Sequence, residues 1–275
     1  MPATPIAYDR FGHGPTVVLL HPTGLGPAVL APFAERLAPD HDVVIPHRRG
    51  YGRSAALDAP VSLDDHLDDL TMVLELVQPV DDSEPVTLVG ISAGATIALA
   101  YAAHHPTTDL RILAHEPLFG PLAPLLHGRV TGRIDRLLAR ADQPLELSLF
   151  ISELVGLPTW NALPAAWREG VEANRGAALA EVGFYAAFAL GDSDLTEIGR
   201  QGLTTSVGAR SNEGRQEAAE VLREHGIGTI VLPDCGHLAP VDAPATFADA
   251  VRLVHGQTRS PQPPAVASLD AGAPR

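Results

Sequence analysis

Short runs of consecutive apolar residues recur along the chain, and residues that favour turns separate them. Six runs have the length of a strand: Thr16–His21, Asp42–Ile45, Val86–Val89, Leu110–Ala114, Leu203–Val207 and Thr229–Leu232. A continuous apolar run of about four to eight residues, in contrast to an alternating one, is typical of a strand buried on both faces. These runs therefore predict a sheet at the centre of the protein.

The segments between the runs carry apolar residues at helical spacing. The clearest segment begins at Ser62 and ends at Pro79, and Ser62 and Asp65 have the spacing of a capping box. Its apolar residues are Leu63, Leu67, Leu70, Leu74 and Val77, close to one face of a helix. Strands that alternate with helices predict the α/β class, with a doubly wound, mostly parallel sheet that helices cover on both faces.

The alternation stops at Pro117 and resumes near residue 200. Residues 118–199 hold no convincing strand, and they read as several helices rich in Leu and Ala that are broken at prolines. A helical block between two alternating sections predicts a lid inserted into a core of residues 1–117 and 200–256. Residues 257–275 are rich in Pro, Ala, Ser and Gly, which predicts a disordered tail.

Composition narrows the class of function. A net charge of −14 argues against nucleic acid or an anionic membrane surface as a partner. All 19 basic residues are Arg, so lysine chemistry is excluded. The single Cys cannot form an internal disulfide, and the first residues lack the pattern of a signal peptide. We therefore expect a cytoplasmic protein.

The candidate chemistry centres on Ser92. It lies in the stretch Val86–Ala98, which reads V-T-L-V-G-I-S-A-G-A-T-I-A, so that an apolar run precedes the serine and an Ala-rich run follows it. In a strand–turn–helix of this kind, G-x-S-x-G holds the serine hydroxyl clear of the backbone, and side chains at Gly90 and Gly94 would collide with neighbouring elements. Ser92 is therefore a predicted nucleophile; the alternative is an ordinary serine in a tight turn.

A serine hydroxyl needs a base to take its proton, and histidine is suited because its unperturbed pKa is about 6.5. Among the twelve histidines, His237 is the best candidate. It follows the predicted strand Thr229–Leu232 and so lies at the edge of the sheet where Ser92 emerges. The alternative is a surface histidine in a loop.

With these motifs in this order, the chain resembles the α/β-hydrolase fold superfamily over about residues 5–117 and 200–256. His21–Gly24, H-P-T-G, is similar to the family's oxyanion loop. His47–Ser54, H-R-R-G-Y-G-R-S, is similar to its Asp-x-Arg-Gly-x-Gly-x-Ser loop, with His in place of Asp. Cys235–Leu238 is similar to the late Gly-His segment that carries the catalytic base.

The resemblance implies an oxyanion hole, because the tetrahedral intermediate of acyl transfer needs N–H donors aimed at its oxygen. One donor is expected to be the amide of Ala93. The second is expected to be Thr23, since Pro22 has no N–H to give.

The acid that would complete a triad with Ser92 and His237 is harder to identify from the sequence. The resemblance places it in a Gly-x-x-Asp pattern after the lid, but that stretch reads Gly208-Ala209-Arg210-Ser211, and Ser211 has no charge to stabilise an imidazolium. Some relatives, haloalkane dehalogenase-like members among them, carry the acid after the strand that follows the nucleophile helix, where Glu116 stands. We therefore predict Glu116. The alternatives left open are Asp192, Asp194, Glu213, a Ser–His dyad and an inactive site.

Aromatic residues make up 5% of the chain, yet many fall in the predicted lid. This concentration predicts an apolar pocket over the site, with Phe119, Trp160 and Phe184 as lining residues. The alternative is packing of the lid against the core. No Gly-rich phosphate loop and no zinc-type spacing of His and acidic residues occur, so neither a cofactor nor a metal is expected.

The sequence thus predicts a cofactor-free serine hydrolase of a small, mostly apolar ester, thioester or lactone. Ser92 would attack the carbonyl, His237 would move the proton, and Glu116 would orient His237. Two alternatives remain: a non-catalytic ligand-binding or regulatory protein on the same fold, and a peroxidase- or lyase-like relative with the same triad. The expected partner is a small-molecule substrate, with no nucleic acid and no membrane; a homodimer is left open.

Overall fold

The computed structural model describes residues 6–54, 60–77, 84–106, 109–257 and 267–268. The strands in this part of the chain are β1 (Tyr8–Gly12), β2 (Thr16–Leu20), β3 (Asp42–Pro46), β4 (Val86–Ile91), β5 (Leu110–His115), β6 (Thr204–Gly208), β7 (Gly228–Leu232) and β8 (Ala267–Ser268). They form one sheet in the order β1-β3-β2-β4-β5-β6-β7-β8. β1 runs antiparallel to β3, and the remaining neighbours are parallel.

The six predicted strands all occur, with bounds shifted by one or two residues. Two further strands were not predicted. β1 lies at the edge of the sheet and carries Asp9 and Arg10, so it has no continuous apolar run; Arg10 forms an ion pair with Asp42 of the neighbouring strand. β8 falls within the predicted tail 257–275, most of which lies outside the described residues.

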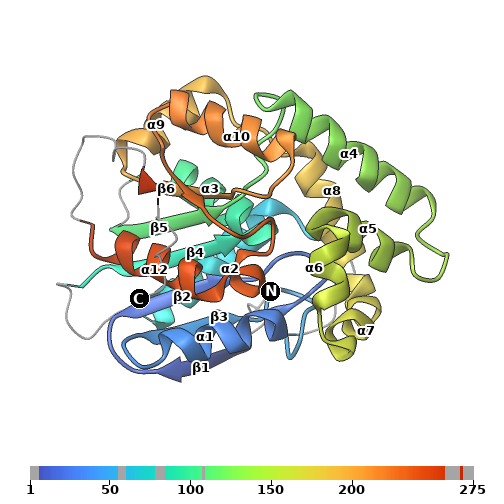
Figure 1. Cartoon of the computed structure of the whole chain (residues 1–275), viewed down its shortest axis with the longest axis horizontal. Helices are drawn as coiled ribbons and strands as arrows, with labels where there is room; N and C mark the ends of the chain where they lie inside the picture. Colours follow the sequence, from blue (N-terminus) through green and yellow to red (C-terminus); the bar gives the residue numbers. More distant parts are fainter. Residues whose placement is uncertain (1–5, 55–59, 78–83, 107–108, 258–266, 269–275) are drawn as a thin grey trace.

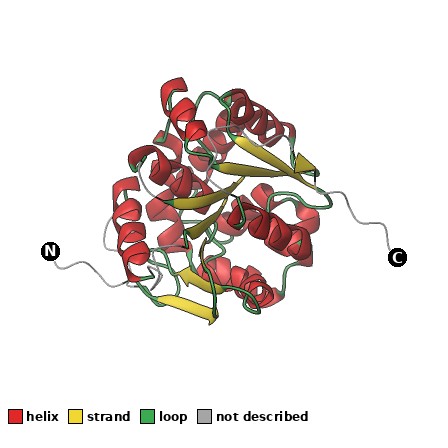
Figure 2. Cartoon of the chain, turned by 90° about the vertical axis from the view of Figure 1, so that its left-hand side faces the viewer, coloured by secondary structure: helices red, strands yellow, loops and turns green. Residues whose placement is uncertain are grey.

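Helices cover both faces of the sheet (Figure 2). The helices outside residues 118–200 are η1 (Pro27–Leu30, a 3-10 helix), α1 (Ala31–Leu37), α2 (Leu63–Leu76), α3 (Ala93–His104), α10 (Glu213–Glu224), α11 (Ala239–Asp242) and α12 (Pro244–His255). α1 packs on α12, and α2 packs on α3. The capping box predicted at Ser62 and Asp65 is present at the start of α2. The predicted α/β class with a doubly wound, mostly parallel sheet is confirmed.

A helical block, α4–α9, separates β5 from β6 in the chain. Its helices are α4 (Pro124–Ala139), α5 (Glu146–Val155), α6 (Leu157–Ala162), α7 (Ala165–Ala173), α8 (Arg175–Ala187) and α9 (Asp192–Arg200). Figure 1 shows α5–α8 gathered to the right of the sheet, while α9 returns to the core at the top of the view. The block lies within the residues predicted to form the lid, apart from the last residue of α9.

The core is centred on the strands and on α3. All residues of β2, β3 and β4 are buried, and so are the first ten residues of α3, most of them small. Small side chains let this helix lie close to the sheet, which fixes its first residue relative to the end of β4. Among the described residues, no helix combines the length and the apolar character needed to cross a bilayer.

Candidate active site

Ser92 occupies the sharp turn between β4 and α3. Its backbone has φ 55° and ψ −114°, a strained conformation for a residue with a side chain. A Cβ on Gly90 would collide with the carbonyl of Gly94, and a Cβ on Gly94 would collide with the carbonyl of Leu20 on β2. The two glycines therefore allow the turn for the steric reason that the sequence suggests, and the turn holds the Ser92 hydroxyl at the carboxyl end of the sheet.

The predicted nucleophile, base and acid form one chain of hydrogen bonds. Ser92 Oγ lies 2.9 Å from His237 Nε2, and His237 Nδ1 lies 2.7 Å from Glu116 Oε2. His237 comes from the loop after β7, and Glu116 directly follows β5. Because parallel strands end at the same edge of the sheet, three segments far apart in sequence meet there. The arrangement has the geometry of a nucleophile, a base and a carboxylate that orients the base.

The carboxylate of Glu116 is buried, and four groups of the core lie within about 3.1 Å of it. Oε1 accepts hydrogen bonds from the Gly208 amide at 2.9 Å and from the Ser211 hydroxyl. Oε2, which accepts from His237, also lies 3.1 Å from Arg215 Nη1. Ser211 stands where the family pattern has its aspartate. Here that position supplies a donor to an acid on the neighbouring strand.

The charges around the site set the resting protonation states. Burial by itself raises the pKa of Glu116, but the positive charge of Arg215 and the contacts with His115 and His237 hold that pKa well below its usual range. Burial and Arg215 lower the pKa of His237 to about 4, against the opposing effect of Glu116. At neutral pH, Glu116 is therefore a carboxylate and His237 a neutral imidazole, which is the form that accepts a proton.

The alternative carboxylates have other partners. Asp192 Oδ1 lies 2.9 Å from His225 Nε2, and Asp194 accepts the Gly191 amide at 2.9 Å at the start of α9. Glu213 lies in the first turn of α10 and forms an exposed ion pair with an arginine of α4. Of the four acids weighed from the sequence, Glu116 is the one that contacts His237.

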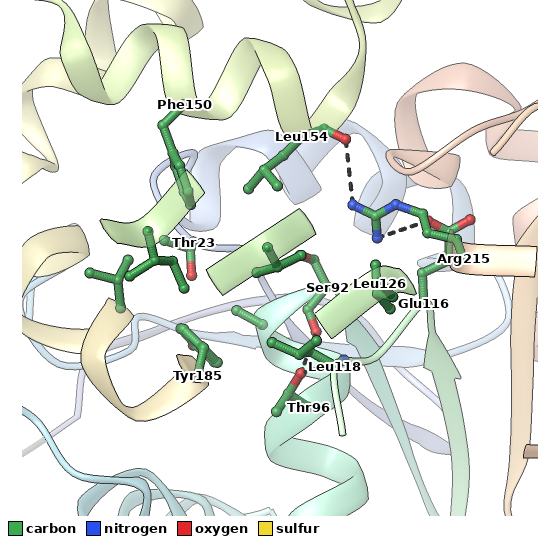
Figure 3. A pocket seen from close by; sticks show the side chains of 14 residues that line it. Thr23, Ser92, Thr96, Glu116, Leu118, Leu126, Phe150, Leu154, Tyr185 and Arg215 are labelled. Atoms are coloured by element: carbon green, nitrogen blue, oxygen red, sulfur yellow. Dashed lines mark hydrogen bonds and ion pairs between the residues drawn. The ribbon is translucent and has the colours of Figure 1, made fainter. Parts of the chain in front are cut away.

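Thr23 and Ala93 line the same cavity as Ser92. Figure 3 shows Thr23 and Ser92 among the lining residues. Ala93 is the first residue of α3, so its N–H has no acceptor within the helix. In the loop after β2, the amide of Gly24 already donates to Tyr51 Oη at 3.1 Å. The amide of Thr23 has no acceptor among the described residues, so it is available to donate to an oxyanion.

The cavity beside Ser92 encloses about 470 Å³, part of it open to solvent. Its apolar lining is Leu118, Leu126, Val130, Ile134, Phe150, Leu154 and Val182. Most of these side chains come from the helical block, and Figure 3 shows several of them around Ser92. Tyr185 and Arg215 add polar groups at the wall, and Arg215 also donates to the carbonyl of Leu154 at 3.5 Å. An apolar group attached to a carbonyl at Ser92 would enter this space.

The predicted pocket residues Phe119, Trp160 and Phe184 do not line this cavity. Phe119 is fully buried, and Trp160 is a half-buried residue of α6 that packs against the core. Phe184 faces an open groove that Leu63 and His104 also line. Its neighbour Tyr185 does line the cavity, because successive residues of a helix point about 100° apart. The composition indicated which helices carry the aromatic residues. It did not indicate which side of each helix faces Ser92.

Arg215 was not among the site residues predicted from the sequence, although the sequence pattern indicates it. In α10 the buried side chains include Ala218, Ala219 and Leu222, and Arg215 precedes them at spacings of three, four and seven residues. The arginine therefore lies on the apolar stripe of an otherwise polar helix. A charge in that position indicates a buried partner, which is Glu116. Within the described residues, no group of three or more His, Cys, Asp or Glu side chains is arranged to hold a metal ion.

Comparison with known proteins places this site in a family. A model of the alpha/beta hydrolase family matches residues 17–250. The chain is 31% identical over 130 residues to an uncharacterized hydrolase, YraK, of Bacillus subtilis, a stretch that covers 46% of this chain and 45% of that protein. It is 34% identical over 112 residues to a pimeloyl-[acyl-carrier protein] methyl ester esterase of Xanthomonas oryzae pv. oryzae, covering 40% and 41%. The matched stretch thus spans less than half the length of these relatives.

A solved structure shares the fold over nearly the whole chain. The structure of a thermophilic esterase from Thermogutta terrifontis superposes with a TM-score of 0.72 at 20% identity and covers 91% of this chain and 94% of that one. The family match confirms the predicted superfamily and the predicted hydrolase class, and the shared architecture confirms the predicted fold. The chain belongs to the alpha/beta hydrolase family.

Proposed function

We propose that this hydrolase cleaves a small, mostly apolar carboxylic ester, thioester or lactone through Ser92, His237, Glu116 and an acyl-enzyme. The observation that supports the proposal is the unbroken hydrogen-bonded chain from Ser92 Oγ through the imidazole to Glu116, open to an apolar cavity. The similarity to an esterase over part of the chain agrees with it.

In the proposed reaction, Ser92 Oγ attacks the carbonyl carbon while His237 Nε2 takes the hydroxyl proton. The carbonyl oxygen becomes an oxyanion, and the amides of Ala93 and Thr23 donate to it. His237 then gives the proton to the leaving oxygen or sulfur, which departs and leaves an acyl-enzyme. Water repeats the same steps and releases the acid. Throughout, the negative charge of Glu116 stabilises the imidazolium that forms.

The cavity supports a small substrate. Its free space of about 470 Å³ includes the part that is open to solvent, so the enclosed part suits a small acyl group. The apolar lining from the helical block favours a hydrocarbon acyl group, because transfer of apolar surface from water stabilises binding. Besides Ser92 and Glu116, the polar residues that line this space are Thr23, Thr96, Tyr185 and Arg215.

An active-site label and two substitutions test the proposal. A fluorophosphonate should react with the wild-type protein at Ser92, and Ser92→Ala should not react. Glu116→Gln should lower kcat for a p-nitrophenyl ester by about 10³–10⁴-fold, because the imidazole loses its orientation and its charge partner. Asp192→Asn is the matched control, since Asp192 contacts His225 instead, and it should leave kcat within about twofold.

Two results would overturn this assignment. Labelling at a residue other than Ser92 would show that Ser92 is not the nucleophile. A change in kcat within about threefold in Glu116→Gln would show that Glu116 is not the acid. Stabilisation by small apolar ligands with no turnover of any acyl ester would favour the ligand-binding alternative instead.

A further inference from the structure

A second buried carboxylate, Glu181 of α8, connects the helical block to the core. Arg48 Nη1 and Nη2 donate to its two oxygens, and Tyr51 Oη donates to Oε1 at 2.5 Å. His66 Nε2 lies 3.4 Å from Oε2. The three partners come from the loop after β3 and from α2, whereas Glu181 comes from the helical block. One carboxylate of the block therefore stands at the centre of a polar cluster of the core.

Glu181 is charged although it is almost fully buried. Burial alone raises its pKa, but Arg48 and His66 hold that pKa well below its usual range. A buried ion pair of this kind is costly to break from one side, because the remaining charge loses its partner. The contact thus fixes α8 relative to the loop after β3.

The same cluster reaches both sides of Thr23. Tyr51 Oη, which donates to Glu181, accepts the Gly24 amide at 3.1 Å. The backbone amide of Arg48 donates to His21 Nε2 at 3.3 Å. His21 and Gly24 flank the segment that contains Thr23, so residues held by Glu181 contact the oxyanion loop before and after its free amide.

The helical block also contacts Gly24 directly. Asn174, at the start of α8, donates through Nδ2 to the Gly24 carbonyl at 2.8 Å. Gly24 has φ +77°, and a Cβ on it would lie 2.6 Å from Ile151 Cδ1 of α5. The N–H, the C=O and the Cα of this glycine are therefore held by three different parts of the protein, two of which belong to the helical block.

These contacts restrict the direction of the neighbouring amide. A peptide group is planar, so fixing Gly24 and His21 restricts the two backbone dihedrals through which Thr23 N–H can turn. We propose that Glu181 and Asn174 are positioning residues, through which the helical block holds the Thr23 amide where it can donate to the oxyanion. This inference rests on the proposed hydrolysis, and it gives the block a part in forming the site besides covering it.

Three variants test the inference. Glu181→Gln removes the charge that faces Arg48 and keeps the shape of the side chain. Asn174→Ala removes only the bond to Gly24; Asn174 is neutral and half-buried and makes no capping bond to α8, so this variant keeps the test valid if Glu181→Gln folds poorly. Glu153→Gln is the matched control, because Glu153 forms its ion pairs with Arg133 and Arg136 within the block.

The first measurement is steady-state hydrolysis of an activated p-nitrophenyl ester. Removal of an oxyanion donor typically lowers kcat by about 10²–10³-fold, so misplacing one should lower it by about 10–100-fold. KM should stay within about threefold, because the oxyanion forms only in the transition state. Affinity for a boronic acid, which forms a tetrahedral adduct on Ser92, should fall by a factor similar to that of kcat. Glu153→Gln should match the wild type in all three quantities.

The second measurement, hydrogen exchange of the Gly24 amide, does not depend on turnover. In the wild type this amide donates to Tyr51 and should be protected; in Glu181→Gln and Asn174→Ala it should exchange at least about tenfold faster. If the wild type hydrolyses esters but both variants behave like Glu153→Gln in kcat and in exchange, the inference is wrong and the proposed function stands. If the wild type hydrolyses no ester, the proposed function fails, and faster exchange in both variants still supports the hold on the loop.

Discussion

The charge of Arg215 provides a quantitative test of the electrostatics around the proposed triad. The substitution Arg215→Met removes the positive charge and keeps an apolar side chain in the wall of the cavity. Nη1 of Arg215 lies 3.1 Å from Glu116 Oε2, the oxygen that accepts from His237 Nδ1 at 2.7 Å. These two distances place Arg215 Nη1 at most about 6 Å from His237 Nδ1. At that separation and an effective dielectric constant of about 20, two unit charges interact by about 3 kcal/mol, or about two pKa units.

The sign of the effect follows from the charge. A cation near His237 disfavours the imidazolium, so removing Arg215 should raise the pKa of His237 from about 4 to about 6. The base must be neutral to act, and the acid limb of kcat/KM reports its pKa in the free enzyme. At pH 5 the variant should keep about a tenth of its plateau kcat/KM, whereas the wild type should keep about nine tenths.

The assay is kcat/KM for a p-nitrophenyl ester between pH 4 and 8, with circular dichroism at each pH to confirm that the protein is folded. Arg215→Lys keeps the charge and should keep the acid limb near that of the wild type. Arg129→Met removes an arginine of α4 whose partner is exposed, and it should leave the profile unchanged. An acid limb in Arg215→Met within about half a pH unit of the wild type would refute the reasoning, because the charge would then have no effect on the imidazole.

Two further predictions concern the acid and the cavity. Ser211→Asp restores the family's usual acid but should lower kcat by at least about 100-fold, because it replaces a donor to Glu116 with a second carboxylate; activity near that of the wild type would contradict the assigned role of Ser211. Phe150→Ala enlarges the apolar cavity and should raise kcat/KM for esters with longer acyl chains relative to acetate by about tenfold, measured across a series of p-nitrophenyl esters, and an unchanged ratio would place the acyl group elsewhere.

The sequence was most informative where burial is strongest. β4 and the Ala-rich α3 could be predicted because every residue of the strand is buried and the helix must lie close to the sheet. β1 could not be predicted, because it is a partly exposed edge strand. Its residues Asp9 and Arg10 interrupt the apolar ones. Hydrophobic pattern thus predicts the central strands of a parallel sheet better than its edges.

The candidate site could be predicted from the positions of its residues after strands. The sequence pattern did not indicate the side-chain contacts. Ser92, Glu116 and His237 each follow a strand, and the topology of a parallel sheet brings such residues together. The cavity lining was predicted wrongly because it depends on the rotation of each helix of the block. A shift of one position exchanges Phe184, which faces the outer groove, for Tyr185, which faces Ser92.

The contacts of Tyr51, Asn174 and Ile151 with Gly24 have a thermodynamic consequence. If the contacts of Glu181 and Asn174 orient the oxyanion donor, docking of α8 and affinity for a tetrahedral adduct are two sides of one linked equilibrium. Boronate binding must then stabilise the docking of α8 by the same factor by which docking strengthens boronate binding. A boronate bound at Ser92 should then slow local opening of the α8 interface, and a solvent that loosens that interface should weaken boronate binding before the chain unfolds. The enzyme would lose its activity while its serine, histidine and glutamate were still in place.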